Sequence, residues 1–542
     1  MTATTPPTTL ISGGTIHQSF LPARTVECLV VSDGRIVHAG GLDEARDRFG
    51  DVDQHVDLEG RTVIPGLVES HAHTVFSGMI SQWADLRPEA TGSVEEIVRA
   101  VRDFGPQDGW YRGWGYDDTL LTEQRHPDRH DLDRVSADTP VLITHISGHF
   151  AVANSAALAV CGIDASTPDP PEGRYIRDED GSPTGLLWEV GAVRTARDQC
   201  PPPSKADGLR AATEVMSAAV AKGITQIHDL GIGSQLAEAE FDLLRELAES
   251  GRMPVRMYGF VRGDLTDALL EDDPDVMGRT FGDRLTIAGV KLWADGSIQG
   301  LSASLIEPYH CCPDSRGDLL LTTADIVERA RPHIESGAQI AIHANGDHAV
   351  AEVIAAYEQL PAPRHGRAGH RIEHFQMAHA DHVAACARAD IGVSVFANHI
   401  HYWGDRHRDR FIGPERAGRM NPVKECLDSG LRTGLHSDSP ITPMDMFATM
   451  DTSTTRRTRD DHTLGGEQAV TPEEALHIAT ASSAALVGQQ DAVGTLTAGM
   501  FADLVVLSQD PLDGTVQAPS TGTFSADHVD ATMVGGTWVY ER

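Results

Sequence analysis

The chain has 542 residues, 79 of them acidic and 44 basic, so its formal net charge is −35. This charge argues against nucleic acid or an anionic membrane surface as a partner. No stretch approaches the roughly 18 consecutive apolar residues of a membrane-spanning helix, and the N-terminus lacks the basic and apolar segments of a secretory signal. We therefore expect a cytoplasmic protein.

The seven cysteines have no Cys-x-x-Cys spacing, which disfavours both a disulfide framework and a thiolate zinc site. Histidine is abundant, with 26 residues, whereas lysine occurs only at Lys205, Lys222, Lys291 and Lys424. Any bound metal would therefore depend on nitrogen and oxygen ligands.

Short strand patterns occur at both ends of the chain. Near the N-terminus, Asp33-Gly34 between two apolar runs predicts a hairpin. Similar patterns return at 494–508 and 530–540. We predict that residues 1–62 and 481–542 form one composite β-sandwich.

The middle of the chain alternates apolar strand candidates with helical patterns, which is typical of a parallel α/β sheet. The candidates are 62–73, 223–231, 254–261, 285–297, 338–347, 370–377, 391–399 and 431–440. Eight is the strand number of a closed (β/α)8 TIM barrel, predicted here for residues 63–480. The absence of a glycine-rich phosphate loop disfavours a nucleotide-binding sheet.

The stretch from about 80 to 205 is too long for an ordinary strand-to-helix connection, which has roughly 2–6 residues. It is predicted to be an insertion after the first barrel strand.

Side chains with ligand chemistry lie where the predicted strands end. Because the carboxyl ends of parallel barrel strands share one mouth, six of them should converge there: His71, His73, Lys291, His343, His374 and Asp438. A His-x-His pair alone is weak evidence, since His399-Ile400-His401 has the same spacing. The convergence of six such side chains is stronger evidence for a metal site. The imidazoles among them suit zinc or a related first-row ion.

Lys291 lies among apolar residues that should be buried. A lone buried ammonium is costly, so it needs a carboxylate, a lowered pKa or chemical modification. Carbamylation by CO2 would make it an anionic oxygen ligand that bridges two ions.

Four further side chains are predicted substrate contacts, and three of them have a structural alternative. His149 could polarise a substrate carbonyl or serve as a hydrogen-bonded loop residue. His228 could reach the mouth or orient another side chain. His399 ends the seventh strand candidate, and Trp114 could line an apolar pocket or belong to the core.

Several motifs together resemble the amidohydrolase superfamily, specifically its YtcJ-like (amidohydrolase 3) branch. They are VIPGLVESHAH (63–73), GVKLWADGS (289–297), IHANGD (342–347), RIEH (371–374), HSDSP (436–440) and GTLTAGMFADLVVL (494–507). Two segments of the insertion, WYRGWGYDDTL and SGHFAVANSAAL, are also similar to that branch, and FANHIHYWGDRH (396–407) most resembles the N-substituted formamide deformylase group. The resemblance implies a β-sandwich and a (β/α)8 barrel with one or two divalent ions, two being favoured.

The resemblance also implies a role for each rim residue. His71 and His73 would bind the first ion, carbamylated Lys291 would bridge, and His343 and His374 would bind the second. Asp438 would contact the first ion and act as general base.

The leading hypothesis is a zinc-dependent hydrolase of non-peptide C–N bonds, in an amide or an N-substituted formamide. A lactone or ester hydrolase on the same site and a non-catalytic regulatory protein are the alternatives. The expected partner is a small-molecule substrate, and a homodimer is expected only as the commonest oligomer.

Overall fold

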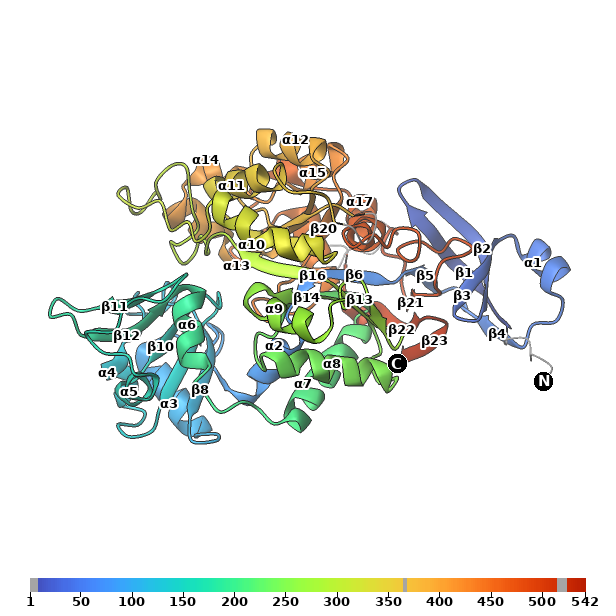
Figure 1. Cartoon of the computed structure of the whole chain (residues 1–542). Coiled ribbons are helices and arrows are strands. Elements are labelled where there is room, and N and C mark those ends of the chain that lie inside the picture. Colours follow the sequence, from blue (N-terminus) through green and yellow to red (C-terminus); the bar gives the residue numbers. More distant parts are fainter. Residues whose placement is uncertain (1–7, 364–367, 514–523) are drawn as a thin grey trace.

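Eight parallel strands form a barrel at the centre of the computed structural model, which describes residues 8–363, 368–513 and 524–542 (Figure 1). In spatial order they are β6 (Leu67–Ala72), β13 (Ile224–Ile232), β14 (Arg256–Arg262), β16 (Leu285–Trp293), β17 (Gln339–Ala344), β18 (Arg371–His374), β19 (Gly392–Val395) and β20 (Thr433–Leu435). The barrel closes where Ser70 Oγ donates to the Leu435 carbonyl and Ala72 bridges Ser439. All eight predicted strand segments supply a barrel strand, so the TIM-barrel prediction is confirmed.

The barrel strands are buried on both faces, which explains their continuous apolar runs. β6 and β17, for example, are buried along their whole length. The helices that cover the barrel include α7 (Lys205–Val220), α8 (Glu238–Glu249), α9 (Gly263–Asp272), α10 (Thr323–Glu335), α11 (Asp347–Tyr357) and α12 (Ala380–Arg388). Among the described residues, no helix is both long and apolar enough to cross a bilayer.

Several predicted segments extend past the strands that they contain, and one of these ends affects a candidate site residue. The segment 391–399 was expected to be extended as far as His399, but β19 ends at Val395 and His399 lies in α13 (Asn398–Arg406). The amide N–H groups of His399 and Ile400 already donate to the carbonyls of Phe396 and Ala397. The chain therefore turns into a helix immediately after the strand, and the period-two alternation stops there.

Both ends of the chain contribute to one sheet, as predicted. Its order is β23-β22-β21-β5-β1-β2-β3, with β4 beside β1. The strands are β1 (Thr8–Phe20), β2 (Ala23–Ser32), β3 (Arg35–Gly40), β4 (Gln54–Asp57), β5 (Thr62–Pro65), β21 (Leu504–Leu507), β22 (Val529–Val534) and β23 (Thr537–Glu541). Asp33 and Gly34 have positive φ angles of 50° and 73° and form the predicted hairpin turn between β2 and β3.

Gly66 alone separates β5 in this terminal sheet from β6 in the barrel. A Cβ atom at Gly66 would lie 2.1 Å from Oγ1 and 2.7 Å from Cβ of Thr225. The close approach of β6 to β13 therefore requires glycine at this position.

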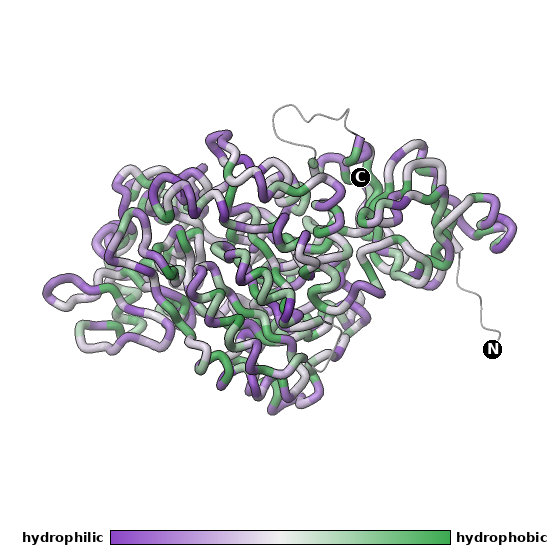
Figure 2. The backbone as a smooth tube through the Cα atoms, turned by 90° about the horizontal axis from the view of Figure 1, so that it is seen from above, coloured by the Kyte–Doolittle hydropathy of each residue, from purple (hydrophilic) through white to green (hydrophobic). Residues whose placement is uncertain are grey.

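The insertion forms a separate six-stranded sheet with the order β11-β12-β10-β9-β8-β7. Its strands are β7 (Ala84–Asp85), β8 (Tyr111–Tyr116), β9 (Val141–His145), β10 (Phe150–Ala153), β11 (Arg174–Arg177) and β12 (Pro183–Trp188). Its helices α3 (Val94–Phe104), α4 (Arg129–Asp133), α5 (Ser155–Cys161) and α6 (Glu189–Arg197) belong to two apolar clusters of its own. The predicted insertion after the first barrel strand is therefore confirmed. In the molecule as a whole, hydrophilic stretches lie mainly along the outer loops (Figure 2).

A buried carboxylate at the start of α8 should give the fold a specific pH dependence. Glu240 Oε2 accepts the N–H groups of Gln235 at 2.9 Å and Leu236 at 3.1 Å. Burial, and after it the charge of Asp229, raises the pKa of Glu240 to about 7. Because the folded state then holds this proton more tightly than the unfolded chain, the free energy of unfolding should fall by roughly 3 kcal/mol as the pH rises from about 4.5 to about 7.

Glu240→Gln is expected to remove this loss, because the amide oxygen still accepts both N–H groups and carries no charge. Denaturant titrations should show similar stability for the variant and the original protein at pH 5, and greater stability for the variant at pH 8. The matched control is Glu238→Gln, at an exposed position in the same turn. An identical pH profile for Glu240→Gln and the original protein would contradict this account.

Candidate metal centre

The carboxyl ends of the barrel strands bring all six predicted rim residues to one mouth. His71 is on β6 and His73 follows it, Lys291 is on β16, His343 is on β17, and His374 ends β18. Asp438 lies three residues after β20. Catalytic residues in TIM barrels occupy this face.

His71, His73 and Asp438 form the first potential ligand group. The Nε2 atoms of His71 and His73 each lie 3.3 Å from Asp438 Oδ1. His73 Nδ1 and Asp438 Oδ1 are buried, and neither has a hydrogen-bond partner among the described residues. Two imidazoles and a carboxylate with unused capacity fit a divalent cation.

His71, His374 and His436 form a second group, whose ligand atoms lie within 4.8 Å of one another. His374 Nδ1 is 3.2 Å from His436 Nε2, and Ser394 Oγ lies 2.7 Å from His436 Nδ1. His436 was missing from the predicted ligand set. The sequence held a signal for it, because His436 and Asp438 are spaced like His71 and His73.

His343 lies beside this second group. Its ring centroid is 4.4 Å from that of His374, and its Nε2 is 3.0 Å from both the Gly296 carbonyl oxygen and Asn345 Nδ2. Asp295 supports this strand end by accepting the N–H groups of Ser304, Asn345 and Gly346. Burial raises the pKa of Asp295 to about 7.

Lys291 is buried at the centre of these side chains. Its Nζ lies 3.5 Å from His71 Nε2. Burial lowers the pKa of Lys291 to about 8, although the charges of Glu373 and Asp438 act in the opposite direction. At neutral pH, a larger fraction of Lys291 than of an exposed lysine is therefore in the neutral, nucleophilic amine form.

Burial lowers the pKa of four rim imidazoles well below the ordinary value: His71, His343, His374 and His436. Neighbouring cationic groups at the rim add to the effect. Neutral imidazole is the form that binds a metal, so the rim is suited to ligation at neutral pH.

A chain of buried polar groups below the rim orients His71. Its Nδ1 donates to Glu373 Oε2 at 2.8 Å, and Arg371 donates to Oε1 of that carboxylate at 2.5 Å and to Oε2 at 2.9 Å. Arg371 Nη1 also contacts His228 Nδ1 at 3.1 Å, and the Gln226 amide contacts His228 Nε2 at 2.9 Å. This arrangement directs His71 Nε2 to the rim. It places His228, for which contact at the mouth and orientation of another side chain were both predicted, in the layer beneath.

The other predicted substrate contacts lie at the edge of the rim. His149, from the insertion, donates to Glu189 Oε2 at 2.7 Å, and its ring centroid is 5.0 Å from that of His343. Burial works against its protonation, but Glu189 gives His149 a net raised pKa. His399 has its ring centroid 6.4 Å from that of His374, and burial lowers its pKa to about 3.

Trp114 is almost fully buried on β8. Its ring packs edge-on against Phe76, with 4.7 Å between the centroids. It therefore supports a wall near the mouth through Phe76.

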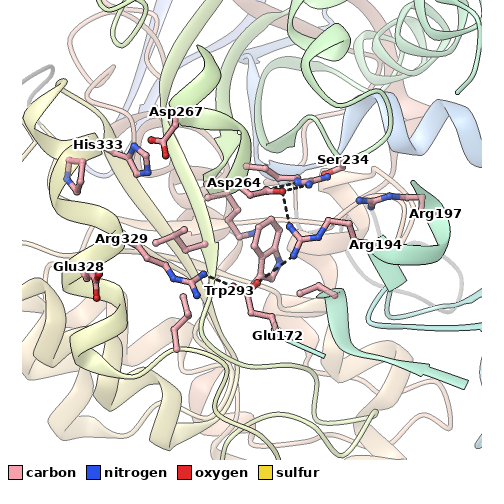
Figure 3. Close-up of a pocket in the computed structure, with 17 residues that line it drawn as sticks. Glu172, Arg194, Arg197, Ser234, Asp264, Asp267, Trp293, Glu328, Arg329 and His333 are labelled. Carbon is pink, nitrogen blue, oxygen red and sulfur yellow. Dashed lines mark hydrogen bonds and ion pairs between the residues drawn. The ribbon is translucent and has the colours of Figure 1, made fainter. Parts of the chain in front are cut away.

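Two cavities lie between the insertion and the barrel. The larger, here called the ion-pair cavity, has a volume of about 440 Å³ and is crossed by the contacts of Arg194 with Asp264 and Arg329 with Glu172 (Figure 3). The smaller, here called the insertion cavity, has a volume of about 340 Å³ and is lined by residues that include Phe76, Gly148 and Ser234.

A parallel barrel with an imidazole-rich rim defines a class of metal-dependent hydrolases. The model of the family described as "Amidohydrolase family" matches residues 54–540, and the chain belongs to this family. The predicted enzyme class and the resemblance to the YtcJ-like branch are confirmed.

Known relatives match almost the whole chain. The chain is 27% identical to the putative amidohydrolase YtcJ of Bacillus subtilis over 98% of this chain and 99% of that protein. It is 28% identical to the N-substituted formamide deformylase of Arthrobacter pascens over 95% of each. The solved structure of an uncharacterized metal-dependent hydrolase from Pyrococcus horikoshii OT3 has a TM-score of 0.75 and 27% identity, covering 93% of this chain and 98% of that one.

Proposed function

We propose that the protein hydrolyses amides or N-substituted formamides with two divalent ions, zinc by the nature of the ligands, at the barrel rim. The observation that supports this most is the pair of overlapping ligand groups that share His71. The similarity to an N-substituted formamide deformylase supports the choice of bond.

His71, His73 and Asp438 would hold one ion, and His343 and His374 the other, with His436 as an additional imidazole beside His374. The neutral Lys291 amine would add to CO2, forming an N–C bond and releasing a proton, and the resulting carbamate would bridge the ions. When bound, the ions lower the pKa of a coordinated water so that hydroxide is available near neutral pH.

The chain's own residues would then move the protons. Asp438, between His71 and His73, would accept a proton from the attacking water and return it to the leaving nitrogen. His149, oriented by Glu189, would donate a hydrogen bond to the substrate carbonyl oxygen.

Lys291→Ala should lower the metal content measured by elemental mass spectrometry from about two equivalents of zinc to one or fewer. His343→Ala should also lower it, because the second ion loses a ligand. Lys222→Ala is the control, because Lys222 contacts Met444 and Asp445 rather than the rim residues. Retention of two ions in Lys291→Ala would show that another group bridges them.

A substrate panel tests the bond class. The metal-loaded protein should hydrolyse N-substituted formamides or simple amides faster than lactones and esters of similar size. Fast lactone turnover with inert amides would reject the proposal in favour of C–O hydrolysis. A fully metal-loaded protein that hydrolyses nothing in the panel would support a non-catalytic role.

A further inference from the structure

The insertion cavity lies next to the candidate metal centre. Ser234 lines this cavity, and its hydroxyl and the His73 ring both lie close to Gly231. A Cβ atom built on Gly231 would lie 2.8 Å from Ser234 Oγ and 2.6 Å from His73 Nδ1. On another side, the cavity is lined by Gly148, the residue before His149. The cavity therefore borders the rim near His73 and His149.

Most of the cavity wall is apolar. It includes Phe76, Met79, Trp83, Leu142, Val193 and Leu265, contributed by both the barrel and the insertion. A volume of about 340 Å³ is at the small end of the range of ligand pockets, roughly 300–1,000 Å³. The wall and the volume fit a compact apolar body such as one substituted aromatic ring.

The cavity also contains a cation with unused hydrogen-bond donors. Arg197, on α6, lines both cavities. Within the part of the chain that the structure describes, its guanidinium donates no hydrogen bond, and its nearest recorded carboxylate contact is Asp198 Oδ1, 3.6 Å from Nε. Figure 3 accordingly draws no interaction between Arg197 and the other lining residues.

Neighbouring arginines differ from Arg197 in this respect. Arg194, one turn earlier on α6, donates to Asp264 Oδ2 at 2.7 Å, and Arg262 donates to the same oxygen at 2.5 Å. Burial, and after it the charge of Arg262, lowers the pKa of Arg197 to about 10, so the group still carries its charge at neutral pH. The Arg197 side chain is 27% exposed, so its N–H groups can donate to an anion that enters the cavity.

A second guanidinium lines the same cavity. Arg112, on β8, uses Nη2 to donate to the Pro201 carbonyl oxygen at 2.8 Å. Its buried Nε has no partner among the described residues. Three guanidinium groups, of Arg112, Arg197 and Arg262, line the cavity together with two carboxylates, of Asp198 and Asp264. The lining therefore has a net positive charge, which favours an anion.

We propose that the substrate carries a carboxylate at the far end of an apolar body, and that Arg197 binds this carboxylate while the amide lies at the metal centre. The planar guanidinium matches a carboxylate in geometry as well as in charge. This inference rests on the proposed hydrolase function and narrows its substrate class.

A matched pair of substrates tests the inference: 4-(formamidomethyl)benzoate, and N-(4-methylbenzyl)formamide as its neutral analogue. The metal-loaded protein should have a kcat/KM about tenfold or more higher for the carboxylate, the effect of one charged hydrogen bond. Arg197→Met should abolish this preference and leave turnover of the neutral substrate within about twofold, whereas Arg197→Lys should keep part of it.

Arg194→Met is the control, because Arg194 is on the same helix but does not line the insertion cavity. It should keep the preference for the carboxylate. Equal kcat/KM values for the two substrates, or a preference that survives in Arg197→Met, would overturn the inference.

Binding of 4-methylbenzoate, measured by calorimetry, separates this inference from the hydrolase proposal. Binding to the original protein that is lost in Arg197→Met, with no turnover of any amide, would retain the anion site and reject the hydrolysis. Turnover of the neutral formamide without any binding of 4-methylbenzoate would retain the hydrolysis and reject the anion site.

Discussion

Asp438→Asn is expected to lower kcat by roughly 10²- to 10⁴-fold while it leaves the fold and much of the bound metal in place. Asparagine has the size of aspartate and keeps one oxygen near His71 and His73, both 3.3 Å from the original carboxylate. It cannot accept the proton of the attacking water. Turnover of the best substrate, measured together with the metal content of the same preparation, tests this role.

The control for Asp438→Asn is Asp428→Asn, whose carboxylate pairs with Lys424 at the surface. This variant should keep normal turnover. A near-normal kcat in Asp438→Asn would mean that another group accepts the proton.

Arg371→Met should cause the largest loss of stability among these substitutions, about 3–5 kcal/mol. Arg371 and Glu373 are both fully buried, and the guanidinium donates to both carboxylate oxygens and to the Ser70 carbonyl. Removing the arginine would leave the Glu373 carboxylate without its cation. Because Glu373 orients His71, metal affinity should also fall about 10- to 100-fold.

Denaturant unfolding of the metal-free protein and zinc retention against a chelator measure the two effects separately. Arg371→Met combined with Glu373→Gln should recover part of the lost stability, because no uncompensated charge remains. A free energy of unfolding within about 1 kcal/mol of the original for Arg371→Met alone would contradict this account.

The barrel and its rim could be predicted from the sequence because both depend on local patterns. Each barrel strand is an apolar run, and His71, Lys291, His343 and His374 come at or near the ends of such runs. In a parallel barrel the carboxyl ends of all strands lie at one mouth, so a residue at such an end can be placed there from the sequence alone.

The orienting residues could not be predicted in this way. Glu373 and Arg371 lie within a short strand and resemble ordinary polar interruptions, and only the fold brings them to His71 and His228. The boundary of β19 was missed because the residue that caps the start of α13, Ala397, has no capping side chain. The insertion cavity depends on contacts between the insertion and residues 233–265, for which no local pattern exists.

The pairing of β5 has a consequence for the newly made chain. β5 has β1 on one side and β21 on the other, and β21 is synthesised only after the whole barrel. Until then one edge of β5 has no partner, and Gly66 joins this incomplete strand directly to the strand that carries His71. The rim should therefore reach its final geometry only when the last strands leave the ribosome, so a metal ion would be captured after synthesis rather than during it.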